Sequence, residues 1–96
     1  MTTLSIRCKM NDYGAFKQAY DGWRQENAAN MGIVASSVFR NVDDPDFVTV
    51  HHQFADETAA KALANQISND EYKEYERQQG YIQVDTMEVT LLKKVE

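Results

Sequence analysis

The residues best able to do chemistry are concentrated in one stretch, VFRNVDDPDFVTVHHQF, which spans residues 38–54. It contains both histidines of the chain, His51 and His52, together with Arg40 and Gln53. Histidine titrates near neutral pH and can act as an acid or a base. Arginine offers a planar pair of donors to carboxylate or enolate oxygens. The combination is typical of a site that orients a small polar or anionic ligand and moves a proton.

The same stretch predicts a β-hairpin. Residues 33–42 and 47–54 are rich in β-branched and aromatic side chains, which favour strands. The acidic segment between them contains Pro45, which has no backbone donor and cannot continue the ladder. The candidate residues are therefore expected on two paired strands.

The pairing of these strands decides which polar side chains lie together. A loop with an even number of residues would place Val42 opposite Phe47. His52 would then face the helices and bond to Ser37, which is a structural role. The opposite face would gather the polar side chains Ser36, Arg40, Thr49, His51 and Gln53. A loop with an odd number of residues would change this pairing, so the assignment depends on loop length.

The other elements surround this hairpin in a regular order. Residues 3–10 alternate between apolar and polar, which predicts a strand with Arg7 on its polar face. Aromatic residues at three- and four-residue steps predict a helix from residue 13 to about residue 30. Residues 55–67 and 69–79 read as helical pieces, and residues 81–94 as the last strand. The order β-α-β-β-α-β predicts a ferredoxin-like α+β sandwich with a four-stranded antiparallel sheet.

Composition limits the class of protein. Ninety-six residues make one domain, 1–96, and the net charge of -5 argues against a nucleic-acid partner. No apolar run is long enough to span a membrane. The N-terminal residues lack the features of a secretory signal, so we expect a cytoplasmic protein. Helices on one face would leave the other face of the sheet open, so we also expect a homodimer through that face.

Three further residues have structural interpretations. Trp23 belongs to the aromatic stripe of the first helix, where a core role is expected. Either Asn11 or Asp12 could cap that helix, and capping is the expected role of Asn11. Cys8 alternates onto the apolar face of the first strand and should be an inert hydrophobic side chain. Adjacent histidines on a strand point to opposite faces, so His51 and His52 cannot chelate one metal ion, and we expect no metal site.

The segment GIVASSVFRNVDDPDFVTVHHQFADETAAKALA, residues 32–64, resembles the middle of the dimeric α+β barrel superfamily. It is most similar to the antibiotic-biosynthesis-monooxygenase-like domains. The features that carry the resemblance are Gly32, Arg40, Asp43-Asp44-Pro45, Phe54 and Asp56-Glu57-Thr58-Ala59. Through the order of elements, the resemblance extends over nearly the whole chain.

This resemblance implies a homodimer whose sheets face each other to form a barrel, with a small-molecule site in it. The superfamily includes cofactor-independent oxygenases, haem-degrading enzymes and lactone isomerases. Haem-degrading relatives bind the iron through a histidine on a later helix, and no histidine follows His52 in this chain. Phe54 also stands where relatives often have tryptophan, so haem turnover is not expected.

The leading hypothesis is a monooxygenase without metal, flavin or other cofactor, acting on a small polar or phenolic substrate in the barrel. His51 would be the base and Arg40 the anion stabiliser. The expected substrate contacts are Arg7, Ser36, Thr49 and Gln53. The alternatives are a non-catalytic dimer that binds a small ligand or a protein partner, and an isomerase of the lactone type.

Overall fold

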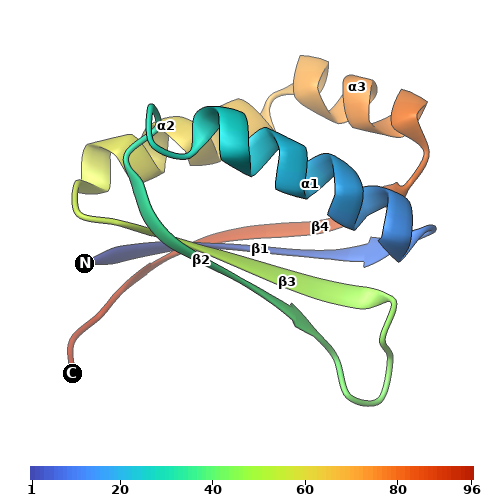
Figure 1. Cartoon of the computed structure of the whole chain (residues 1–96), viewed down its shortest axis with the longest axis horizontal. Helices are drawn as coiled ribbons and strands as arrows, with labels where there is room; N and C mark the ends of the chain where they lie inside the picture. The colour runs from blue at the N-terminus through green and yellow to red at the C-terminus, as the bar shows by residue number, and fades with distance from the viewer.

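The computed structural model describes residues 1–96, and it has the predicted ferredoxin-like architecture. The strands are β1 (Thr2–Met10), β2 (Ile33–Arg40), β3 (Phe47–Phe54) and β4 (Ile82–Lys93). The helices are α1 (Tyr13–Asn27), α2 (Glu57–Ser68) and α3 (Asp70–Gln79). The strands form one antiparallel sheet in the order β2-β3-β1-β4. All three helices cover the same face of this sheet and leave the other face open (Figure 1).

Local capping sets the boundaries of the helices. Asp12 begins α1 by accepting a hydrogen bond from the backbone N–H of Ala15 at 3.0 Å. The predicted cap, Asn11, instead donates to the carbonyl of Gly80, because Asp12 occupies the capping position. Asn69 has an extended backbone that separates α2 from α3, and its side chain caps α3. This break lets α3 run in its own direction along the sheet.

The core lies between the helices and the sheet. Leu4 and Phe54 are fully buried at one end of it, against α2. Cys8 is 3% exposed in a second cluster with Val48 and Val50, as its place on the apolar face predicts. Burial raises the pKa of the Cys8 thiol, which keeps it protonated near neutral pH.

The pairing expected for the hairpin was wrong by one residue. The backbone N–H of Asn41 donates to the carbonyl of Phe47 at 2.9 Å, which leaves the odd-length loop 42–46 between them. Ser36 consequently lies opposite His52, and Arg40 opposite Val48. A shift of one residue exchanges the faces of a strand. Ser36 and Arg40 therefore lie on the helix face of β2 rather than on the open face.

Candidate functional site

The two residues expected to act as base and anion stabiliser lie on opposite faces of the sheet. Arg40 lies over the ring of Tyr13 in α1, 3.9 Å from its centroid, and its Nε donates to the carbonyl of Pro45 at 2.7 Å. His51 points to the open face, where its ring meets the edge of Phe39 at 5.2 Å. Within one chain, these side chains do not share a site.

Three of the four expected substrate contacts lie on the open face with His51. The guanidinium of Arg7 lies 3.9 Å from the ring centroid of Phe47 and 3.7 Å from the carboxylate of Glu88. Thr49 lies opposite Arg7 in the neighbouring strand, and Gln53 opposite Thr3. The fourth, Ser36, is on the helix face with His52. The register thus divides the predicted site between the two sides of the sheet.

His52 is the histidine that faces the interior. It is 2% exposed, and its Nδ1 lies 2.8 Å from the hydroxyl of Ser36, not of Ser37 as the expected pairing required. Its ring stacks on Tyr20 at 5.9 Å and tilts against Trp23 at 5.6 Å. Burial, aided by the positive charge of Arg24 and by His51, lowers the pKa of His52 to about 4. His52 is therefore neutral at pH 7, and its Nε2 has no hydrogen-bond partner in the chain.

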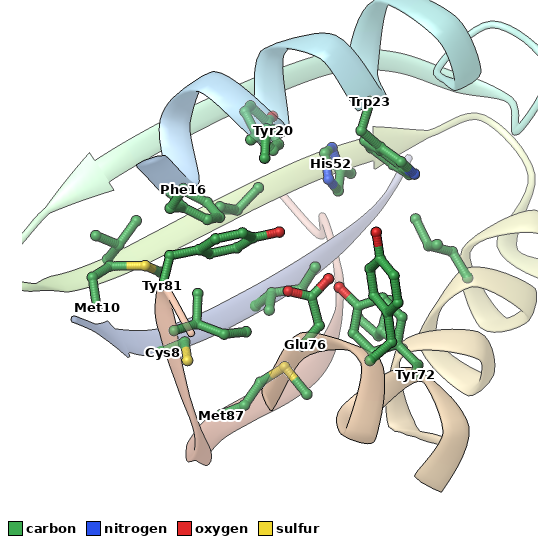
Figure 2. A pocket seen from close by; sticks show the side chains of 18 of the residues that line it. Cys8, Met10, Phe16, Tyr20, Trp23, His52, Tyr72, Glu76, Tyr81 and Met87 are labelled. Atoms are coloured by element: carbon green, nitrogen blue, oxygen red, sulfur yellow. The ribbon is translucent and has the colours of Figure 1, made fainter. Parts of the chain in front are cut away.

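A cavity of about 310 Å³ lies between the helices and the sheet. Figure 2 shows His52 and Trp23 on one side of it and Tyr81 and Glu76 reaching in from another. Aromatic side chains from α1, α3 and the segment before β4 contribute much of its lining: Phe16, Tyr20, Trp23, Tyr72, Tyr75 and Tyr81. Trp23, for which only a core role was expected, packs against the core and also lines this cavity. Such a volume is at the lower end of the roughly 300–1,000 Å³ usual for small-molecule sites.

Glu76 supplies the one carboxyl group of the cavity. It is 7% exposed, and its carboxyl group points into the space between the aromatic rings (Figure 2). Burial raises the pKa of Glu76, while hydrogen bonds from Tyr81 and Tyr72 partly oppose the shift. Burial and the nearby Glu76 raise the pKa of Tyr81 to about 12 and that of Tyr72 further. The result is a carboxyl group suited to accept a proton, with two protonated phenols beside it.

The hydroxyl of Tyr20 is a second unusual polar group in this region. Tyr20 is 8% exposed and lines the cavity, yet its buried hydroxyl has no hydrogen-bond partner in the chain. Most buried polar groups in proteins are satisfied. The hydroxyl is thus an unpaired polar group enclosed by the protein.

Glu76 was not among the residues that the sequence predicted for the site. It lies in the segment NDEYKEYERQQ among exposed acidic residues such as Glu71 and Glu74. The available signal was its helical spacing, because Tyr72 and Glu76 are four residues apart and therefore share one face of α3. Only the packing of that face against the sheet distinguishes Glu76 from its neighbours.

The chemical groups of the cavity are those of acid–base chemistry. No cluster of three or more histidine, cysteine or acidic side chains is placed to hold a metal ion. The cavity combines one buried carboxyl group, one neutral imidazole and several phenols.

None of the helices has the length and apolar character needed to cross a membrane.

Neither a protein-family model nor a curated protein sequence matches the chain. Solved structures do match over nearly its whole length. A mutant form of SnoaB, a cofactor-independent oxygenase from Streptomyces nogalater, is 12% identical, with a TM-score of 0.70 over 99% of this chain and 93% of that chain. PA3566 from Pseudomonas aeruginosa is 13% identical, with a TM-score of 0.66 over 99% and 94%. A structure described as antibiotic biosynthesis monooxygenase is 12% identical, with a TM-score of 0.65 over the whole of both chains.

These likenesses confirm the predicted resemblance at the level of the fold. The chain has the ferredoxin-like fold of the antibiotic biosynthesis monooxygenase structures. Fold alone does not determine chemistry, so the activity has to be argued from the cavity.

Proposed function

We propose that the protein is a cofactor-independent monooxygenase that oxidises a small phenolic substrate in the cavity between the helices and the sheet. The observation that carries the proposal is the carboxyl group of Glu76, buried in an aromatic-lined cavity of about 310 Å³. The likeness in fold to SnoaB, which is named as a cofactor-independent oxygenase, supports the same reaction class. This cavity replaces the barrel as the proposed site, because Arg40 and His51 lie on opposite faces of the sheet.

Glu76 would begin the reaction by accepting the proton of the substrate hydroxyl. A base works best when its pKa lies near the working pH, and burial moves the pKa of Glu76 in that direction. The transfer converts an ionised Glu76 and a neutral phenol into a neutral carboxylic acid and a phenolate. The cavity carries one negative charge before and after the step, so no additional charge has to be buried.

The phenolate then supplies the electrons that dioxygen needs. One electron passes to dioxygen, and the two radicals combine to form a carbon–oxygen bond. Breakage of the oxygen–oxygen bond releases water and leaves a quinone. For 1-naphthol the balance is one naphthol and one dioxygen giving one naphthoquinone and one water. His52 would orient the substrate through Nε2, since Ser36 fixes the other ring nitrogen.

Oxygen consumption with a panel of phenols and quinols tests the proposal. We expect 1-naphthol or a related compound to be consumed with one dioxygen per quinone formed, above the rate without protein. Ala19 lines the cavity and is also exposed, so it lies at the rim. Ala19→Trp should block the cavity and reduce the rate at least about tenfold. Gln18→Trp adds the same bulk at an exposed neighbouring position of α1 and should leave the rate unchanged.

Two results would contradict the proposal. Binding of phenols without oxygen consumption would favour the non-catalytic ligand-binding module. Equal rates for Ala19→Trp and Gln18→Trp would place any activity outside this cavity.

We also propose that the chain forms a homodimer through the open face of its sheet. Phe39 is 50% exposed there beside His51, and Arg7 and Glu88 add complementary charges to the same face. Burial of this face would extend the small core of a chain of 96 residues. In this dimer, His51, Arg7, Thr49 and Gln53 would line the barrel and contribute to its interface.

Sedimentation analysis should therefore give twice the chain mass of 11.0 kDa. Phe39→Lys should shift the protein toward monomer, because it places an unpaired charge in the interface. Val42→Lys is the matched control, since Val42 is 97% exposed in the hairpin loop. A wild-type monomer, or a Phe39→Lys dimer as stable as wild type, would exclude this interface.

A further inference from the structure

We infer that the cavity selects its ligand by charge, so that it binds uncharged aromatic compounds, phenols included, and excludes those that carry a carboxylate, with Glu76 as the discriminating residue. The inference deepens the proposed function, since it specifies the substrate class of the same site. It concerns binding, however, and can be tested without turnover.

The lining of the cavity contains no positively charged residue that could pair with an anion. No lysine or arginine contributes to it, and most of its residues are hydrophobic. Glu76 is its only acidic side chain and takes part in no ion pair. A ligand carboxylate would lose its hydration without gaining a cation, which is strongly unfavourable. An ionised Glu76 would add direct repulsion.

Arg77 and Arg24 carry positive charges near this region, but neither lines the cavity. Arg77 follows Glu76 in α3, but its guanidinium binds the carboxylates of Asp85 at 2.9 Å and Glu74 at 3.5 Å on the exposed side of the helix. Arg24 influences the pKa of His52 but is exposed and does not line the cavity. Neither residue is placed to receive a carboxylate inside.

The polar groups that do reach the cavity suit neutral hydroxyl groups. The carboxyl group of Glu76 accepts from a phenol, and Nε2 of His52 has no partner in the chain. Aromatic rings around these groups favour stacking with a flat ligand.

Calorimetric titration with three matched ligands near neutral pH tests the inference. 1-Naphthol and methyl 1-naphthoate are uncharged, whereas 1-naphthoate is an anion of nearly the same shape as its ester. We expect both neutral ligands to bind at least about 30-fold more tightly than 1-naphthoate. The ester comparison uses the wild-type protein alone, so it does not depend on the folding of any variant.

Variants identify the residue responsible. Glu76→Gln removes the charge at constant shape and should reduce the preference for neutral ligands about tenfold. Glu71→Gln removes an exposed acid from the same helix and should leave the preference unchanged, as should Arg24→Gln.

Several outcomes would overturn the inference. One is binding of 1-naphthoate as tight as, or tighter than, that of the neutral ligands. Another is failure of both neutral ligands to bind. A third is a preference for neutral ligands that is unchanged in Glu76→Gln. Loss of 1-naphthoate binding in Arg24→Gln would also contradict it, because Arg24 would then be an anion receptor. Selective binding of neutral ligands without oxygen consumption would leave the inference standing and reject the proposed oxygenase activity.

Discussion

Glu76→Gln is expected to lower the rate of phenol oxidation by about 100-fold or more, while ligand affinity changes only a few-fold. General bases typically contribute about 10²- to 10⁴-fold to a rate. Glutamine keeps the size of the side chain but cannot accept the proton. The loss should therefore appear in kcat rather than in KM.

The pH dependence of the wild-type rate gives a second signature of Glu76. The wild-type rate should rise with pH as Glu76 ionises. Because burial raises the pKa of Glu76, this rise should occur at a higher pH than for an ordinary glutamate. Glu76→Gln should lack this limb of the profile. Glu71→Gln, at an exposed position of the same helix, should retain both the rate and the profile. An unchanged kcat in Glu76→Gln would mean that another group accepts the proton.

Acidification from pH 6.5 to about 4 is expected to reduce the free energy of unfolding by up to about 3 kcal/mol through His52 alone. The pKa of His52 is lower in the folded chain than in the unfolded chain, so the unfolded state binds the proton more tightly. The stabilisation is complete above the unfolded pKa of 6.5 and is lost as the pH falls to about 4. Protonation at these pH values thus favours unfolding.

Urea denaturation at a series of pH values measures this effect. Acidification also acts on other groups of the protein, so the informative quantity is the difference between wild type and a variant. His52→Gln should flatten the pH dependence by the His52 contribution, whereas Ser37→Ala, opposite His51 on the other face of the sheet, should leave it as in wild type. Parallel curves for wild type and His52→Gln would show that His52 is not held neutral by burial.

The sequence by itself determined the elements and their order. Alternation in residues 3–10, the aromatic stripe of α1, the break at Asn69 and the glycine at position 80 are local signals. Each acts through backbone geometry or capping within a few residues; Gly80, for example, ends α3 with a left-handed φ of 81°. The β-α-β-β-α-α-β order then restricts the chain to a sheet covered by helices on one face.

The tertiary structure alone decided which side chains share a site. The odd-length loop 42–46 moved Arg40 and Ser36 to the helix face and separated Arg40 from His51. Strand faces alternate with every residue, so a loop one residue longer or shorter than expected reverses the assignment.

Burial of Glu76 was equally invisible in the sequence. Its acidic neighbours in α3 are exposed, and its own side chain is enclosed because α3 packs this face against β4 and α2. Contacts between residues far apart in the chain create the cavity, raise the pKa of Glu76 and keep His52 neutral. Local sequence patterns carry little information about such contacts, because burial and charge shifts depend on what the rest of the fold places around a side chain.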